Sequence, residues 1–339
     1  MFLKNRFALH TFSFMAALLI LGCTENAQNV MPQHTAPIWP ALLEKNDKIA
    51  IVAPAFRDAD AKEEKLIGQA TEIFRAWGLK VVLGRSMGSK YGAFAGDDST
   101  RAADLQEMFD DPTIRAIFTY KGGYGSTRII DRLDFTKFLQ HPKWVVGFSD
   151  ITTILAKLHQ LGVVSVHGEM ILHFPEPAYQ NSLISIKTIL FAGGIALTAE
   201  PDVRNRIGEA EAPVVGGNLA VIGTNIGTQS DLDTRGKILV IEELGEHLYA
   251  LDRMLCQLER TGKLAHLAGL VVGGMVDTKG TKAQFGKDAY EIIQSYVAPY
   301  AYPVAYNFPI GHAAPNIAFP HGGMGKLCVR EEKVILNFW

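Results

Sequence analysis

Short apolar runs alternate with longer amphipathic segments through the first half of the chain. The runs at residues 48–54, 79–83, 114–119 and 144–146 predict strands. The segments at residues 61–77, 99–109, 125–133 and 151–161 have the spacing of helices. Because strands that alternate with crossover helices pair in parallel, this half of the chain is predicted to form an α/β domain with a parallel sheet.

The second half of the chain shows the same alternation. Strands are predicted over residues 237–242 and 268–273, and helices over residues 250–262 and 287–298. A stretch of mixed character, rich in proline and glycine, separates the two halves and predicts an interdomain connection. The predicted divisions are an N-terminal domain at 46–174, the connection at 175–212 and a smaller, β-rich C-terminal α/β domain at 213–339.

The N-terminal 22 residues are predicted to be a secretory signal. Lys4 and Arg6 precede an apolar stretch at residues 12–21, which is too short to span a membrane. Cys23 follows Ile-Leu-Gly and resembles the lipobox cysteine of bacterial lipoproteins; an ordinary signal with an incidental cysteine is the alternative. We expect a lipid anchor at Cys23, a flexible tether at 23–45 and a periplasm-facing place in the cell envelope. Thr24 is not the aspartate typical of inner-membrane retention, which favours the outer membrane.

Charge and cysteine content narrow the range of functions. Loss of the signal removes two positive charges and no negative one, so the formal net charge goes from −2 to −4. Such a chain lacks the basic excess that indicates nucleic-acid binding. Cys256 and Cys328 lie in neither metal-ligand nor Cys-x-x-Cys spacing, and whether they pair stays open. A chain of about 300 residues buries a large core without a disulfide framework.

Ser149 occupies the most distinctive position in the first half. It follows the apolar run at 144–146 and Gly147, and it precedes a predicted helix. A serine at such a strand-to-helix turn lies beside backbone N–H groups that suit attack on a carbonyl and capture of the oxyanion. The motif differs from Gly-x-Ser-x-Gly because Ile151 replaces the second glycine. Ser149 with Asp150 also fits an ordinary helix N-cap.

A glycine-rich loop, Lys-Gly-Gly-Tyr-Gly at residues 121–125, also comes directly after a predicted strand. Carboxyl ends of parallel strands meet at one edge of a sheet, so this loop and Ser149 are expected to share an edge. The loop lacks the Lys-Ser/Thr ending of a phosphate-binding loop and is not the dinucleotide fingerprint. It is better interpreted as a source of exposed N–H groups. A tight turn in which Tyr124 packs on its neighbours is the alternative.

Several segments, taken in order, resemble one family. They are Tyr120–Arg128 with Gly147–Thr152, Gly216–Asn218, Ile238–Glu246 with Leu251–Leu255, and Phe308–His312. Their order and spacing are similar to those of the LD-carboxypeptidases, serine peptidases that include muramoyltetrapeptide carboxypeptidase and the microcin-immunity peptidases. The resemblance runs from about residue 48 to the C-terminus.

The resemblance implies a fold and a catalytic set. Ser149 matches the nucleophile, Glu242 the glutamate after the apolar strand, and His312 the histidine of the Gly-His pair. The implied fold is a Rossmann-like N-terminal domain with a separate C-terminal domain. The family resemblance also implies that the protein uses no metal or other cofactor and commonly forms a homodimer.

Elementary chemistry agrees with these three residue types. A serine needs an imidazole to remove its proton, and the imidazole needs a carboxylate to hold its tautomer and charge. Glu242 follows four apolar residues and is expected at the end of a strand, although an exposed acid would look the same. His312 lies in a loop, where a solvated histidine is the ordinary case. The other candidate bases are His167, His247 and His321.

The oxyanion hole and the substrate contacts are less closely defined. The N–H of Asp150 is expected to act with one from the glycine loop, and the resemblance favours Gly123. Lys121 stands where most family members have arginine; in the role of a carboxylate ligand, lysine would keep the charge and lose the bidentate fork. Lys121, Tyr124 and Asn218 are therefore candidate substrate contacts.

The sequence thus predicts a serine-type LD-carboxypeptidase that releases a C-terminal D-amino acid from murein tetrapeptides through an acyl-enzyme. Its expected partners are the murein peptide and, through the anchor, a membrane. One alternative is an immunity-type peptidase that acts on a peptide or aminoacyl-nucleotide conjugate. The other is a non-catalytic lipoprotein that only binds peptidoglycan peptides.

Overall fold

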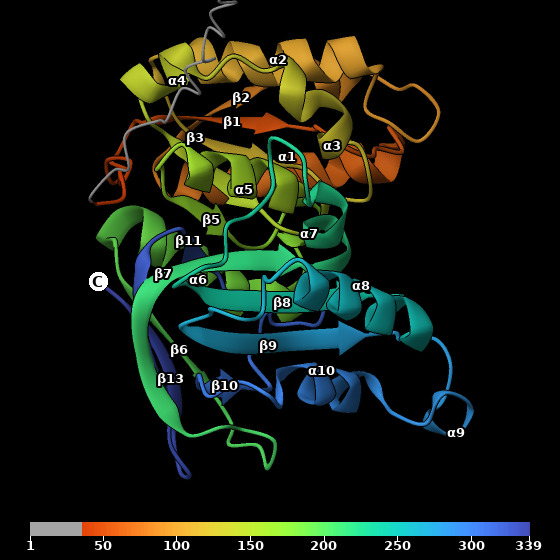
Figure 1. The fold of residues 1–339 in the computed structure, drawn as a ribbon. Coiled ribbons are helices and arrows are strands. Elements are labelled where there is room, and N and C mark those ends of the chain that lie inside the picture. The colour runs from red at the N-terminus through yellow and green to blue at the C-terminus, as the bar shows by residue number, and fades with distance from the viewer. Residues whose placement is uncertain (1–35) are drawn as a thin grey trace, which may run out of the picture. The chain divides into compact units, whose positions relative to one another are not determined.

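Two β-sheets organise residues 36–339, the part of the chain that the computed structural model describes (Figure 1). These residues form one compact unit. The predicted signal, Cys23 and the tether before residue 36 lie outside the described residues.

The first sheet has the strand order β11-β5-β4-β3-β1-β2. Its strands are β1 (Lys48–Val52), β2 (Lys80–Leu83), β3 (Ile114–Thr119), β4 (Trp144–Gly147), β5 (Ser165–His167) and β11 (Phe319–His321). Strands β1 to β5 pair in parallel, which confirms the predicted α/β class with a parallel sheet. Strand β11 comes from the C-terminal half of the chain and pairs antiparallel with β5.

Helices cover both faces of this sheet. They are α1 (Ala61–Ala76), α2 (Asp98–Asp110), α3 (Ser126–Ile129), α4 (Thr136–Gln140), α5 (Thr152–Gln160) and α6 (Gln180–Ala192). Alternate residues of β1 face opposite sides: Ile49 and Ile51 pack with α1 and α6, and Ala50 and Val52 pack with α2, α4 and α5. Helix α2 begins earlier than predicted because the carboxylate of Asp97 caps it through the Thr100 N–H.

The second sheet has the order β10-β9-β8-β7-β12-β13-β6. Its strands are β6 (Ile195–Ala199), β7 (Gly208–Asn218), β8 (Ile238–Leu244), β9 (Gly269–Val276), β10 (Val304–Ala305), β12 (Met324–Val329) and β13 (Val334–Phe338). Strands β7 to β10 are parallel, and the rest are antiparallel. The helices that follow its strands are α7 (Leu219–Asn225), α8 (Leu248–Arg260), α9 (Lys282–Phe285) and α10 (Ala289–Val297).

The predicted connection at 175–212 contains regular elements. Helix α6 packs its apolar side chains into the core beneath the first sheet, and β6 pairs with β13 at the edge of the second. The segment thus contributes to both sheets. Cys256 in α8 and Cys328 in β12 are both free thiols.

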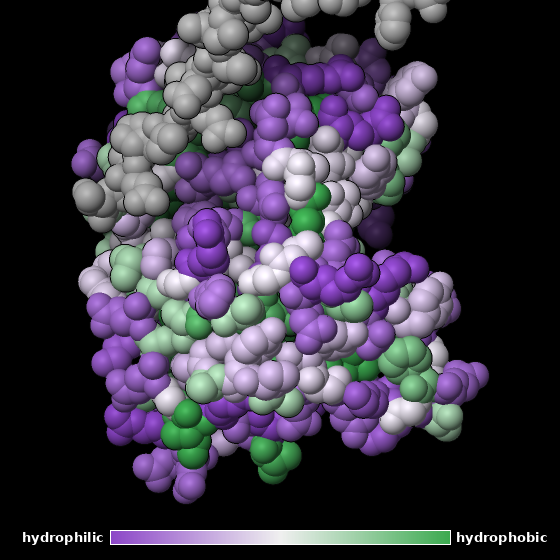
Figure 2. All heavy atoms as spheres, viewed as in Figure 1, coloured by the Kyte–Doolittle hydropathy of each residue, from purple (hydrophilic) through white to green (hydrophobic). Residues whose placement is uncertain are grey.

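The described surface is largely polar. Figure 2 shows one face on which hydrophilic side chains prevail and apolar side chains form small separate groups, as is ordinary for a protein surface. Among the helices of residues 36–339, none has the length and apolar character needed to cross a bilayer.

Candidate active site

Ser149 lies at a strained turn between β4 and α5. Its φ is +60°, a left-handed conformation that is rare for a residue with a side chain and is typical of functional sites. A Cβ on Gly147 would collide with Thr119 and come within 2.9 Å of Ile151. The missing side chain at Gly147 therefore makes room for Ile151, which stands where related turns have a second glycine.

The glycine loop packs against this turn. A Cβ on Gly122 would come within 3.1 Å of the Ser149 Oγ, so glycine lets the loop approach the serine closely. The buried Asp150 carboxylate accepts hydrogen bonds from the backbone N–H groups of Gly125 at 3.2 Å and Ser126 at 2.8 Å. Asp150 thereby ties the end of the glycine loop to the serine turn. Burial raises the pKa of Asp150, and these hydrogen bonds oppose the rise.

The two backbone N–H groups predicted for the oxyanion hole are free within the described chain. Neither the Gly123 N–H nor the Asp150 N–H donates to any acceptor of residues 36–339. Gly123 has a φ of +99°, and a Cβ there would collide with Phe56. Only glycine fits this position, where the loop passes beneath the Phe56 ring.

His312 lies between Ser149 and Glu242. Its Nδ1–H donates to the Glu242 Oε2 at 2.7 Å, and its Nε2 lies 3.1 Å from the Ser149 Oγ. Both distances are within hydrogen-bond reach, so the three side chains form a continuous line from carboxylate to hydroxyl. Glu242 is fully buried, while His312 is partly exposed.

A bulge in the second sheet brings these residues together. Glu242 lies inside β8 rather than at its end, which corrects the prediction, and β9 places Gly273 and Gly274 opposite it. The Gly274 N–H donates to the Ile310 carbonyl at 2.9 Å. This bond holds the segment that leads into His312 against the bulge. The bulge thus sets the approach of the imidazole to the carboxylate.

The electrostatic surroundings favour the charged form of His312. Burial by itself lowers the pKa of His312, and the hydrogen bond and charge of Glu242 oppose this effect. The charges of Glu243 and Glu169 act in the same direction as Glu242, and the pKa is raised above its ordinary value of 6.5. The site therefore stabilises an imidazolium, as a histidine that accepts a serine proton requires.

The other candidate bases do not contact the serine hydroxyl. They are His167, His247 and His321. His167 is fully buried, and the Phe148 ring packs against both His167 and His312, at centroid distances of 5.7 and 4.8 Å. His321 on β11 accepts the Gly216 N–H at 3.1 Å, and His247 directly precedes α8 and stacks on Tyr249.

The candidate substrate contacts have different surroundings. Lys121 Nζ lies 2.6 Å from Asp58 Oδ2 and 3.6 Å from Glu63 Oε1, so two carboxylates balance its charge. Tyr124 is exposed beside the glycine loop, and its ring packs against Phe56 and Phe94.

Asn218 serves the fold. Its Oδ1 accepts the Val221 N–H and caps α7, and its Nδ2 donates to Glu243 Oε1 at 2.9 Å. Glu243 also accepts the Ala220 N–H at 2.7 Å. Because these hydrogen bonds occupy its side chain, Asn218 has a structural role at the start of α7.

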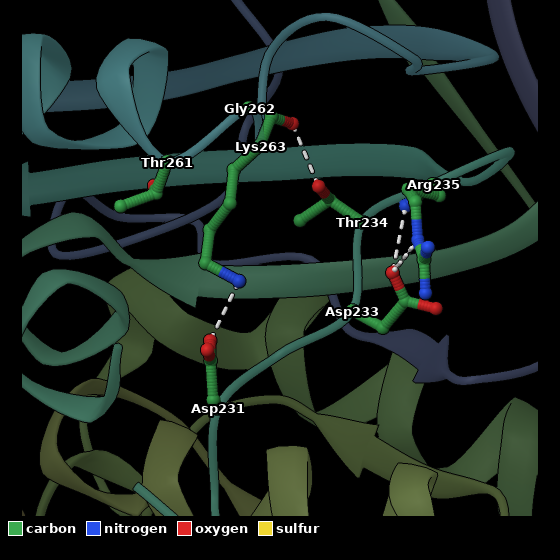
Figure 3. Close-up of a pocket in the computed structure, with 7 residues that line it drawn as sticks. All are labelled: Asp231, Asp233, Thr234, Arg235, Thr261, Gly262 and Lys263. Atoms are coloured by element: carbon green, nitrogen blue, oxygen red, sulfur yellow. Dashed lines mark hydrogen bonds and ion pairs between the residues drawn. The ribbon is translucent and has the colours of Figure 1, made fainter. Parts of the chain in front are cut away.

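A surface pocket lies elsewhere on the second domain and is shown in Figure 3. The residues that line it are Asp231, Asp233, Thr234, Arg235, Thr261, Gly262 and Lys263. Its charges are paired, with Lys263 at 2.6 Å from Asp231 and Arg235 at 3.1 Å from Asp233. Ser149, Glu242 and His312 do not line this pocket.

Two buried polar residues near the site gave no recognisable signal in the sequence. Glu169 follows β5, and Asn316 lies in the loop that contains His312. Each is an isolated polar residue between apolar ones, and only the folded chain brings the two within 3.4 Å of each other. Among residues 36–339, no group of three His, Cys, Asp or Glu side chains lies close enough together to hold a metal ion.

Comparisons with known proteins identify the family of the chain. The family model of the LD-carboxypeptidase N-terminal domain matches residues 49–168, and that of the C-terminal domain matches residues 211–327. A probable murein peptide carboxypeptidase of Bacillus subtilis is 32% identical over 303 residues, covering 88% of this chain and 94% of that protein.

Solved structures show the same fold. The crystal structure of muramoyltetrapeptide carboxypeptidase from Oxalobacter formigenes has a TM-score of 0.78 at 27% identity and covers 86% of this chain and 98% of that one. MccF in complex with glutamyl sulfamoyl guanosine has a TM-score of 0.79 at 20% identity over 89% and 99% of the chains, which shows the fold alone. The chain therefore belongs to the LD-carboxypeptidase family, as its motifs predict.

Proposed function

We propose that this protein is a serine carboxypeptidase that hydrolyses the bond to a C-terminal D-amino acid, D-alanine, in murein tetrapeptides. The observation that carries the proposal is the line from Glu242 through His312 to Ser149, with contacts of 2.7 and 3.1 Å. The names of the relative from Bacillus subtilis and of the solved enzyme from Oxalobacter formigenes support the murein substrate.

The reaction proceeds by acyl transfer. The Ser149 Oγ attacks the carbonyl carbon of the bond to the D-residue while its proton passes to the His312 Nε2. Glu242 holds the Nδ1–H and balances the imidazolium. His312 then gives the proton to the leaving amine as the C–N bond breaks. Water, activated by the same imidazole, hydrolyses the ester and restores Ser149.

Backbone N–H groups of Asp150 and Gly123 stabilise the oxyanion that forms on the carbonyl oxygen. Each such donor contributes about 2.7–4 kcal/mol to lowering a barrier of this kind. Both groups are unengaged in the described chain, and Asp150 and the Phe56 ring hold the backbone that carries them. Tyr124, exposed beside this loop, is proposed to contact the peptide. To bind the terminal carboxylate of the substrate, Lys121 would have to release its ion pair with Asp58.

Replacement of the serine tests the proposal. Ser149→Ala removes the nucleophile and is expected to lower D-alanine release from a murein tetrapeptide by about 10⁶-fold. Release is measured by chromatography, and the fold is monitored by thermal unfolding. Ser99→Ala, at an exposed serine in the first turn of α2, is the matched control and should behave as wild type.

The outcomes separate the alternatives. Unchanged turnover by Ser149→Ala would remove Ser149 from the mechanism. Cleavage of an aminoacyl-nucleotide conjugate in preference to the tetrapeptide would favour an immunity-type peptidase. Binding of the tetrapeptide without reaction of Ser149 with a fluorophosphonate would indicate a receptor.

We further propose an envelope location, on the sequence alone. Acyl chains at Cys23 would hold the protein on the membrane, with the outer membrane favoured by Thr24. In cells, Cys23→Ser is expected to move the protein from the membrane fraction to the soluble fraction. Retention of the variant on membranes would contradict the anchor. A homodimer, also proposed, would give twice the monomer mass in solution.

A further inference from the structure

A second polar layer lies behind the catalytic histidine. The Gly311 N–H, directly before His312, donates to the Asn316 Oδ1 at 3.0 Å. The Asn316 Nδ2 donates in turn to the Glu169 Oε2 at 3.4 Å. Asn316 and Glu169 are both fully buried. The loop that carries the imidazole is therefore joined through one amide to a buried carboxylate on the other domain.

The layer is fixed at both ends. The Glu169 Oε1 accepts the Met170 N–H at 2.9 Å and the His173 Nδ1–H at 2.9 Å. The Asn316 backbone N–H donates to the Ser182 Oγ of α6 at 2.9 Å. Buried polar groups with this many partners have one low-energy arrangement, because losing a partner costs a desolvation penalty.

The loop depends on this layer for its shape. The Ile317 N–H donates to the Pro309 carbonyl at 2.7 Å and closes the base of the loop that contains His312. Inside this closure, the Asn316 side chain bonds the backbone one residue before the imidazole. A shift of the amide would move His312 relative to Ser149, and a displacement of about 1 Å at a reacting group costs about 100-fold in rate.

We propose that Asn316 and Glu169 are positioning residues for His312: the Asn316 amide holds the loop that carries the imidazole, and the Glu169 carboxylate favours the imidazolium formed during acyl transfer. The inference rests on the proposed proton transfer from Ser149 to His312 and not on the murein substrate.

Charge supports the second half of the inference. The groups that act on His312 are Glu242 and Glu243 of β8, Glu169 after β5, and His167 of β5. Burial lowers the pKa of His312, and the three carboxylates raise it, with Glu242 having the largest effect. Glu242 contacts the imidazole directly, whereas Glu169 acts from behind the loop. Loss of the Glu169 charge should therefore lower the pKa of His312 without breaking the line to Ser149.

The test uses the rate at which a fluorophosphonate labels Ser149, measured from pH 5 to 9 on the full chain. Neutral His312 activates the serine, so the acid limb of the profile follows its titration. Glu169→Gln is expected to shift the midpoint of this acid limb to lower pH by about half a unit. Asn316→Asp keeps an acceptor for the Gly311 N–H but sets a carboxylate against Glu169, and should lower the maximal rate about tenfold.

The double variant Glu169→Gln/Asn316→Asp provides the decisive reading. It reverses the hydrogen bond, because the glutamine amide now donates to the aspartate, and it keeps one carboxylate in the layer. We expect the maximal labelling rate to return to within about threefold of wild type. Relative to Glu169→Gln, the acid limb should move back up to the wild-type pH or higher. A role in folding alone would leave the acid limb of Glu169→Gln at its wild-type position.

Ser185→Ala is the matched control. It removes a buried acceptor of the Ala318 N–H, at 2.8 Å, on the segment that leaves the same loop. It should lower the unfolding temperature and leave the acid limb in place.

Two results would overturn the inference: a folded Glu169→Gln with the wild-type limb, or a double variant no faster than Asn316→Asp. If Asn316→Asp does not fold, Asn316→Ser replaces it, with wild-type labelling as the contrary result. If Glu169→Gln does not fold, the limb is compared between the double variant and Asn316→Asp, which carry one and two carboxylates in the layer; equal limbs would refute the effect of charge. A protein that labels at Ser149 but releases no D-alanine would refute the proposed substrate alone.

Discussion

Glu242 and Gly311 show how closely single residues are fitted in this site. The Glu242 carboxylate is fully buried, and its Oε1 has no hydrogen-bond donor among residues 36–339. Its Oε2 accepts the His312 Nδ1–H at 2.7 Å, so the imidazole supplies the hydrogen-bond donor that the buried carboxylate needs. Gly311 has a φ of +112°, and a Cβ there would lie 2.7 Å from the same oxygen. Glycine is thus required both by the backbone and by the carboxylate.

Gly311→Ala is expected to displace Glu242 from His312. The fluorophosphonate labelling rate of Ser149 should then fall at least tenfold, which corresponds to an activation barrier higher by about 1.4 kcal/mol or more. Left-handed backbone strain should also lower the free energy of unfolding by about 1–2 kcal/mol. Gly286→Ala is the matched control, because Gly286 has a φ of +91° and open space around its Cβ position. It should show the strain without the loss of labelling. Equal labelling by both variants would contradict the close fit at Gly311.

The secondary structure elements position the site through irregularities. Strand β4 ends in a turn where Ser149 has a positive φ, and β9 bulges opposite Glu242. The bulge exposes the Gly274 N–H to the Ile310 carbonyl, a bond that the regular ladder would not provide. The Asp150 carboxylate caps the short helix α3 and so fixes the glycine loop. Each irregularity orients one component of the site, while the regular parts of the strands supply the rigid frame.

The two sheets of the described chain meet through buried histidines. His167 of β5 lies 3.3 Å from where a Cβ on Gly217 of β7 would be, and His321 of β11 accepts the Gly216 N–H. His159 of α5 packs edge-on against His321 at 6.0 Å. Burial lowers the pKa of His167 to about 3 and that of His159 to about 4, and it lowers the pKa of His321 as well. These rings are therefore held neutral.

Stability is accordingly expected to fall with acidity. Below about pH 6.5 the unfolded chain binds protons at these three histidines and the folded chain does not, so each lowers the free energy of unfolding by about 1.4 kcal/mol per pH unit. The loss continues down to about pH 4 for His159 and about pH 3 for His167. His312, with its raised pKa, acts in the opposite sense: its stabilisation is present below pH 6.5 and is lost as the pH rises through its folded pKa.

Urea unfolding at pH 7.5, 6.0 and 5.0 measures this dependence. His321→Gln retains an acceptor for the Gly216 N–H and cannot bind a proton, so its stability should decline less steeply than that of wild type. A stability that does not change between pH 7.5 and 5.0 would show that these histidines are not held neutral.

The sequence was sufficient for the α/β class, the family and most of the long elements. Period and turn residues are local, so β3 at Ile114–Thr119 and α1 at Ala61–Ala76 follow from neighbouring residues. The sequence does not predict the short strands β5, β10 and β11. A strand of two or three residues is too short to show a hydrophobic period, and only pairing with distant strands defines it. Helix α6 escaped because its proline-flanked segment resembles a linker, although its apolar face packs in the core.

The residue types of the site were recognisable before the structure, since a nucleophile, a base and a carboxylate have few chemical substitutes and stood in recognisable motifs. Their distances were not, because Ser149, Glu242 and His312 come from two domains and meet only when β4, β8 and the loop after β10 are packed together. Glu169 and Asn316 depended on tertiary structure even for their identification. Burial and hydrogen bonding between distant segments are properties of packed atoms, and no local pattern encodes them.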